Sequence, residues 1–179
     1  SNPQSYLPCV AMSLNNLAVL HQELKKYKVA LGEYEEALEK YRQLAASNPQ
    51  SYLPGMAITL NNLANLHSDR RKYKVALGEY EEALEIYQKL AATNPQSYLP
   101  YVSSTAINLS IFYQKAVPDR QKSITLANEA LTIIQPFLKI SMFQQYAATA
   151  QQVLDDWEQK STSFSFGRLG ANITNILFW

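Results

Sequence analysis

Two histidines and one cysteine are the side chains in this sequence that could support acid–base, nucleophilic or metal chemistry. His21 and His67 stand 46 residues apart, and no cysteine or cluster of carboxylates lies at a spacing that would complete a metal site. Cys9 has no histidine at the spacing of a nucleophilic motif, and no glycine-rich phosphate loop is present. The glutamates around Glu33 and Glu79 indicate a solvated helix face with spaced ion pairs. We therefore predict no enzyme, no metal and no cofactor, and interpret both histidines as packed or partly exposed core residues.

Asparagine is the other polar residue that recurs at a fixed interval. Asn16, Asn62 and Asn108 are 46 residues apart, and Asn15 and Asn61 stand beside the first two. A side-chain amide both donates and accepts hydrogen bonds, so such a row could hold the backbone of an extended peptide. Alternatively, the same amides could bond the next helix of the protein itself. Both interpretations remain open at the level of sequence.

The asparagines belong to a long internal repeat. The heptapeptide Asn-Pro-Gln-Ser-Tyr-Leu-Pro starts at Asn2, Asn48 and Asn94, a period of 46 residues. Residues 2–47 and 48–93 are identical at 33 of 46 positions. Self-similarity at this period is typical of a solenoid, in which each unit buries its apolar face against its neighbours.

Each unit predicts two antiparallel helices, because apolar residues recur at steps of three and four in both of its halves. Pro8, Pro54 and Pro100 suit the first turn of the first helices, and Asn48-Pro49 and Asn94-Pro95 end the second helices. Gly32 and Gly78 fall inside the second helices at a cost of about 1 kcal/mol relative to alanine, and we interpret them as marks of a tight helix crossing. In the first unit the two apolar stripes are Val10, Leu14, Leu17 and Leu20 or His21, and then Tyr27, Ala30, Tyr34, Ala37, Leu38 and Tyr41.

The pattern of these residues resembles the tetratricopeptide repeat. The period also falls in the range of armadillo and HEAT repeats, but the residue pattern decides against them. The Leu-Asn-Asn-Leu-Ala run at 14–18 and 60–64 is similar to the kinesin-light-chain type, which recurs in bacterial multi-repeat proteins. The resemblance implies an all-α, right-handed α-solenoid of antiparallel helix pairs, with about seven helices. The positions that carry it in the first unit are Leu14, Leu17, Ala18, His21, Tyr27, Ala30, Tyr34 and Ala37.

The units suggest a division of the chain. We expect three repeats at 2–47, 48–93 and 94–139, the third of them degenerate, followed by a capping helix at 140–160. An apolar tail, 161–179, closes the sequence. Three interpretations of this tail stay open: a flexible segment of a longer protein, a segment docked on its own stack or on a neighbouring molecule, or an independent motif.

Composition narrows the classes of partner. Apolar residues make up 47% and charged residues 17%, which is a globular composition. Sixteen basic and fifteen acidic side chains give a formal net charge of +1, so we expect no nucleic-acid partner. No basic-then-apolar leader opens the sequence, and no stretch approaches the ~18 apolar residues of a membrane span. A single cysteine excludes an internal disulfide and fits a reducing compartment. We therefore predict a cytoplasmic protein without membrane contact.

The resemblance also implies where a partner binds, because the first helices of successive tetratricopeptide units line a concave wall. We expect the asparagine row to hold the backbone of a protein or peptide ligand, and the varied neighbouring residues to select it. The alternative function is a structural spacer or self-association module of a larger protein, with the tail joining copies. The expected selecting residues are Met12 and Ile58, Val19 and Asn65, and Glu23, Asp69 and Lys115.

Overall fold

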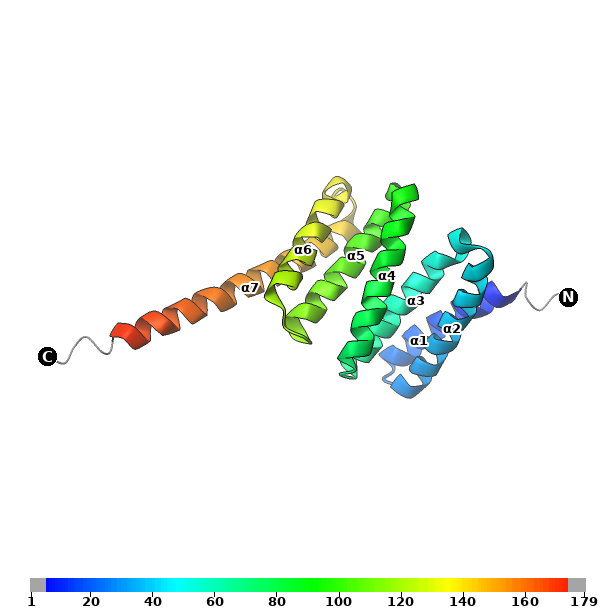
Figure 1. The fold of residues 1–179 in the computed structure, drawn as a ribbon, viewed down its shortest axis with the longest axis horizontal. Helices are drawn as coiled ribbons and strands as arrows, with labels where there is room; N and C mark the ends of the chain where they lie inside the picture. Colours follow the sequence, from blue (N-terminus) through cyan, green and yellow to red (C-terminus); the bar gives the residue numbers. More distant parts are fainter. Residues whose placement is uncertain (1–5, 174–179) are drawn as a thin grey trace.

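The computed structural model describes residues 6–173, with side chains for residues 6–161, and this part of the chain is almost entirely helical (Figure 1). It contains seven α-helices and one short 3-10 helix, and no strand. The prediction of an all-α solenoid of about seven helices is confirmed. The helices are α1 (Leu7–Glu23), α2 (Tyr27–Ser47), α3 (Pro49–Asp69), α4 (Tyr73–Thr93), α5 (Pro95–Lys115), α6 (Arg120–Ile134), η2 (Gln135–Phe137) and α7 (Ser141–Ile173).

Consecutive helices pack as antiparallel pairs in two layers (Figure 1). The closest partners are α1 with α2, α3 with α4, and α5 with α6, and each pair then packs on the next through α2–α3 and α4–α5. The first helices α1, α3, α5 and α7 form one layer, and α2, α4 and α6 form the other. Each hairpin therefore buries its apolar faces against its neighbours, as expected for a solenoid.

Short sequence signals set the ends of the helices. The Asn48 side chain accepts a hydrogen bond from the Ser51 backbone N–H at 3.2 Å, and Asn94 caps α5 in the same way. A proline follows each asparagine at the first helical position. Lys25 and Arg71 adopt φ of 59°, the left-handed conformation that ends a helix, so the first two hairpins each turn within three residues. The third hairpin turns over the four residues 116–119.

Small residues lie where the two helices of a hairpin cross. Ala64 and Ala76 are fully buried in one cluster between α3 and α4. The third hairpin has Ser110 and Ser123 at these places, and each hydroxyl donates to the other residue's carbonyl, at 2.7 and 2.9 Å. The Trp157 indole N–H from α7 donates to the Ser123 hydroxyl at 2.9 Å. A tight apolar contact is thus replaced by a satisfied polar one that also holds α7.

The close approach between helices is not at the glycines where we predicted it. A Cβ built on Gly32 or Gly78 meets nothing within 4 Å, so the interpretation of these residues as a tight crossing is wrong. The close contact is at Gly55, where a Cβ would lie 2.5 Å from the Tyr41 ring. The repeated sequence shows that a residue recurs, but the side of the helix it faces depends on the packing.

We expect Gly78→Ala to raise the free energy of unfolding by about 0.5–1 kcal/mol, because alanine fits the open site and restricts the unfolded chain. Urea denaturation followed by circular dichroism measures the change. Gly55→Ala is the matched control in the preceding helix, and we expect it to be less stable than the parent. A destabilised Gly78→Ala variant would show that this part of α4 is covered in solution.

The last helix is longer than the predicted helix at 140–160. It starts at Ser141 and continues to Ile173, and its second half extends away from the stack (Figure 1). No proline follows Pro136, and isolated glycines cost a helix only about 1 kcal/mol each. The side chains of residues 162–173 and the segment 174–179 lie outside the described part, so the proposed role of the tail in joining copies stays a prediction.

Candidate functional site

Three hollows follow the layer of first helices, one at each step from helix to helix. They measure about 380 Å³ between α1 and α3, about 230 Å³ between α3 and α5, and about 320 Å³ between α5 and α7. Asn65 and Asp69 line both the first and the second, and Ile111 and Lys115 line both the second and the third. The hollows therefore form one series, which we call the inner groove. From α1, α3 and α5 it is lined by Val19, Gln22, Glu23, Asn62, Asn65, Ser68, Asp69, Asn108, Ile111, Phe112, Gln114 and Lys115.

The repeated asparagines connect neighbouring first helices. The Asn62 amide donates to the Asn15 side-chain oxygen at 3.3 Å, and Asn108 donates to Asn61 at 3.3 Å. Asn15 also donates to Asn16 at 3.4 Å. Bonding to the next helix, which we had left open, is thus what the structure shows for these amides. Each such bond uses one of the two N–H groups of the donating amide.

The structure brings several of the predicted selecting residues to the inner groove. Val19, Glu23, Asn65, Asp69 and Lys115 all line it. The remaining predicted residues lie nearer the N-terminal ends of the first helices. Met12 and Ile58 are exposed there, one helical turn before Asn16 and Asn62.

Sequence reasoning missed a polar row in the groove. Gln22, Ser68 and Gln114 line it, each one residue before a predicted position. Their spacing is again 46 residues, which is the signal that would have found them. Gln114 donates to the Val153 carbonyl at 3.3 Å and to the Asp156 carboxylate at 3.2 Å, so it also joins α7 to the groove wall.

Two buried tyrosines, which also line the hollows, orient two of the groove amides. Tyr34 donates to the Gln22 side-chain oxygen at 3.1 Å, and Tyr80 donates to the Asn65 side-chain oxygen. Burial, with smaller contributions from the charges of Glu23 and Glu33, raises the pKa of Tyr34 to about 12. Burial raises the pKa of Tyr80 as well. Both phenols therefore stay protonated and act as fixed donors at neutral pH.

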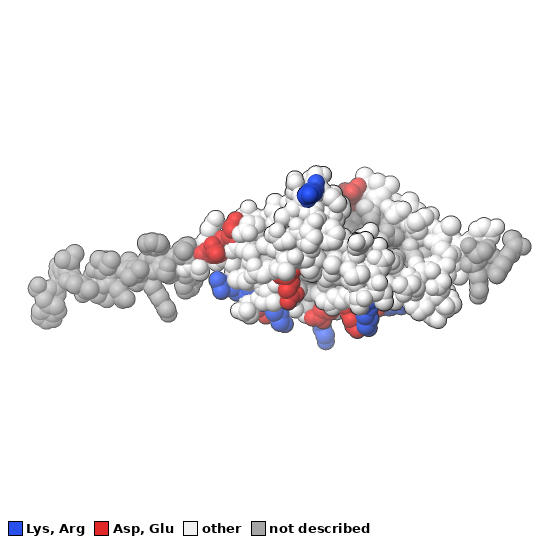
Figure 2. All heavy atoms as spheres, turned by 90° about the horizontal axis from the view of Figure 1, so that it is seen from above, with Lys and Arg blue, Asp and Glu red and all other residues white. Residues whose placement is uncertain are grey.

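Charge is distributed unevenly between the two layers. Among Asp, Glu, Lys and Arg, α1 contains only Glu23, α3 only Asp69 and α5 only Lys115, all in the last turn of their helices. The helices α2 and α4 carry many more such residues. Seen from above, the charged side chains gather along one edge of the molecule and much of the other visible surface is uncharged (Figure 2). The inner groove therefore mixes polar and apolar side chains, with one charged residue from each of α1, α3 and α5 and Asp156 from α7.

Both histidines pair with a glutamate of the same hairpin. His21 Nδ1 lies 2.7 Å from the Glu33 carboxylate, and His67 Nδ1 lies 2.8 Å from that of Glu79. We expected Glu33 and Glu79 to lie on a solvated helix face, and this expectation is wrong. The two helices of each hairpin face one another and bring each glutamate against a histidine. The 12-residue separation, which recurs in the next unit, was the available signal. In the described part of the chain, no three His, Cys, Asp or Glu side chains gather as metal ligands.

Burial raises the pKa of the Glu79 carboxyl above its ordinary value of 4.5, and the hydrogen bond with His67 opposes part of this change. At a pH between the ordinary pKa of Glu79 in the unfolded chain and its raised pKa in the folded chain, the folded chain holds more protons. The free energy of unfolding therefore falls as pH rises through this range. Glutamine cannot titrate. We therefore expect the stability of Glu79→Gln relative to wild type to increase from about pH 4 to about pH 7 in urea denaturation. Glu33→Gln, in the more exposed pair, controls for loss of the pair itself. A difference that does not change with pH would contradict this expectation.

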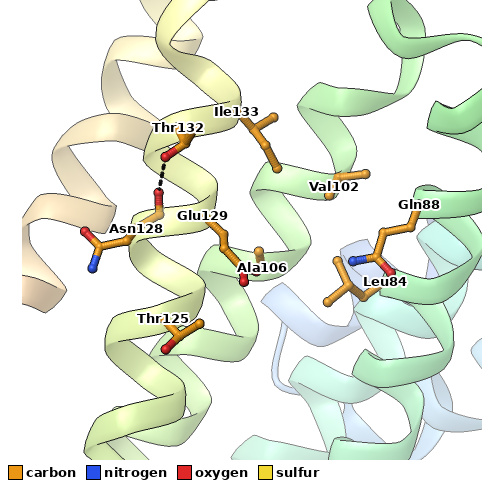
Figure 3. A pocket seen from close by; sticks show the side chains of 9 residues that line it. All are labelled: Leu84, Gln88, Val102, Ala106, Thr125, Asn128, Glu129, Thr132 and Ile133. Carbon is orange, nitrogen blue, oxygen red and sulfur yellow. Dashed lines mark hydrogen bonds between the residues drawn. The ribbon is translucent and has the colours of Figure 1, made fainter.

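A larger hollow lies on the other side of the stack, between α4, α5 and α6 (Figure 3). It measures about 530 Å³, and we call it the outer hollow. Ala106 lies on its floor, at the place where the first two units have leucines Leu14 and Leu60. The change from leucine in the first two units to alanine at position 106 was the sequence signal for the outer hollow. The outer hollow is lined by Leu84, Gln88, Val102, Ala106, Thr125, Asn128, Glu129, Thr132 and Ile133.

Paired antiparallel helices in two layers, with a groove along the first helices, define this protein as an α-solenoid of helical hairpins. Residues 9–89 match the tetratricopeptide repeat family. The predicted resemblance is confirmed. None of the described helices combines the length and apolar character needed to cross a membrane.

A similar fold occurs in the crystal structure of BtubC (BKLC) from P. vanneervenii. The two align with a TM-score of 0.63 and 21% sequence identity, over 97% of this chain and 67% of that one. At this identity the likeness concerns the fold alone. Comparison with curated protein sequences gives no match.

Proposed function

We propose that the inner groove binds an extended segment of another protein. Tetratricopeptide repeats are generally protein-interaction modules and typically non-catalytic. The observation that carries the proposal is the continuity of the three hollows, which share Asn65, Asp69, Ile111 and Lys115. The cytoplasmic and bacterial setting expected from the sequence remains a prediction.

The chemistry of the groove suits a polypeptide backbone. Amides and hydroxyls offer both donors and acceptors, which an extended backbone needs in alternation. Hydrogen bonds fix the groove before a ligand arrives, since Tyr34 and Tyr80 hold Gln22 and Asn65. A preorganised site loses less conformational entropy on binding.

The charges at the edge of the groove suggest the ligand's polarity. Glu23 and Asp69 line the first hollow, Asp69 and Lys115 the second, and Lys115 and Asp156 the third. We expect the bound segment to place a basic residue near Glu23 and Asp69, where two carboxylates line the same hollow.

Selection of a displayed random-peptide library on the full chain tests the proposal. We expect enriched peptides to lose at least about tenfold in affinity, or about 1.4 kcal/mol, for a groove variant with Ser68→Arg and Ile111→Arg. The control carries Gln88→Arg and Thr132→Arg in the outer hollow and should bind like wild type. Circular dichroism must first show the same helicity for all three proteins. Peptides that bind the groove variant equally well, or lose affinity only for the control, would overturn the proposal.

A further inference from the structure

One side of α1 exposes a stripe of large apolar side chains. Val10, Leu17 and Leu20 are 39%, 45% and 49% exposed, and their spacing places them on one helix face. Tyr6 and Leu24 continue the row at its two ends, at 59% and 56%. We call these five residues the α1 stripe. Contiguous apolar patches of this kind mark surfaces that another element covers.

The equivalent positions of the second hairpin are buried. Met56, Leu63 and Leu66, each 46 residues after a stripe residue, are 8%, 1% and 0% exposed. They share one cluster with Tyr34 and Tyr41 of α2, the second helix of the preceding hairpin.

The third hairpin repeats the arrangement. Val102, Leu109 and Phe112 are 5%, 3% and 3% exposed. The Phe112 ring lies 5.6 Å from the ring of Tyr80 on α4, which is again the second helix of the preceding hairpin. In both internal cases the covering element is thus the same kind of helix, placed in the same way.

The sequence before α1 is the one that joins hairpins elsewhere in the chain. Ser47 is the last residue of α2, and Asn48-Pro49 leads directly into α3. Ser1, Asn2 and Pro3 repeat these three residues one period earlier. The residues ahead of α1 therefore match a junction that elsewhere connects a covering second helix to the first helix it covers.

We propose that the α1 stripe is the docking surface for the second helix of a further tetratricopeptide-type hairpin, joined through Asn2 in the same polypeptide. A second copy of the chain offers no free helix of this kind among its described residues, because α3 covers α2, α5 covers α4, and α7 covers α6. This interface is separate from the inner groove and does not depend on the proposed peptide binding.

Cys9 provides the readout, because it is exposed and is the sole cysteine of the chain. Its equivalent in the second hairpin is Gly55, which lies under the Tyr41 ring of the covering helix. In the third hairpin the equivalent Tyr101 stacks on Tyr87 with the ring centroids 5.2 Å apart. A helix docked on the α1 stripe would therefore cover the Cys9 thiol.

The probe is a copy of residues 48–93, which contains no cysteine, placed ahead of Asn2 in the full chain instead of Ser1. This repeats the junction between Thr93 and Asn94. We expect iodoacetamide to modify Cys9 at least about tenfold more slowly in the extended chain than in the parent. Introducing Leu17→Glu and Leu20→Glu should restore fast modification in the extended chain and leave the helicity of the parent unchanged.

Three results would overturn the proposal. One is equal modification rates in the extended and parent chains. Another is an added copy that contributes no helical circular dichroism. The third is a parent chain whose Cys9 becomes protected as its concentration rises while light scattering reports a dimer, since the α1 stripe would then be an interface between copies.

Discussion

Replacing Leu63 by alanine is expected to lower the free energy of unfolding by about 2–5 kcal/mol. The side chain is 1% exposed and lies in the cluster that joins α3 to α2. Truncation removes buried methyl groups and leaves a cavity that the two packed hairpins cannot fully close. Urea denaturation monitored by circular dichroism gives the change, with the midpoint and the slope fitted separately.

Leu17→Ala is the matched control, because Leu17 occupies the same position one repeat earlier but is 45% exposed. We expect it to change the free energy of unfolding by less than about 1 kcal/mol, since alanine is also the better helix former. Equal losses for Leu17→Ala and Leu63→Ala would contradict the structure at the α1 stripe, because they would require Leu17 to be covered in the isolated chain.

Enlarging Ala76 to leucine is expected to cost about 1–3 kcal/mol or more. Ala76 has no exposed surface and lies in one cluster with the fully buried Ala64 at the crossing of α3 and α4. A larger side chain must push the two helices apart, and each neighbouring hairpin resists that movement.

Ala92→Leu is the control for this second substitution, in the same helix but at an exposed position. We expect its free energy of unfolding to stay within about 0.5 kcal/mol of wild type. Thermal melting of both variants checks the comparison. If Ala76→Leu melted like Ala92→Leu, the close crossing of α3 and α4 would be wrong.

The ends of α2 and α4 were predictable because local residues set them, whereas α3 and α5 begin at Pro49 and Pro95 and hold Pro54 and Pro100 inside the helix, where we expected the first turn. Asn48 and Asn94 cap α3 and α5, and a proline follows each of them at the first helical turn. These signals act within four residues of the backbone they satisfy. The 46-residue period then placed the equivalent helices along the whole repeat.

Contacts between helices were less predictable, since they depend on how two helices cross. Spacing alone could not show that Glu79 reaches His67, or that Gly78 faces open space. Nor does identity of repeat position fix the environment of a side chain. Leu17 and Leu63 are the same residue at the same place, and the preceding hairpin alone makes the difference in their exposure.

The lining of the candidate groove was predictable only where it depends on spacing within a single helix. Val19, Asp69 and Lys115 follow from helical spacing on the first helices. The bonds of Asn62 to Asn15 and of Asn108 to Asn61 join different hairpins, so their geometry depends on the rise from one hairpin to the next.

The neighbour-only packing of this fold has a mechanical consequence. Apart from two weaker pairs, contacts join helices that are adjacent in the chain or separated by one other helix. A chain pulled from its two ends therefore loses one hairpin without breaking the contacts inside a distant one. Each 46-residue hairpin would release about 150–165 Å of contour length, at 3.3–3.6 Å per residue. The protein should thus lengthen under tension in discrete steps, while the hairpins that remain keep their shape.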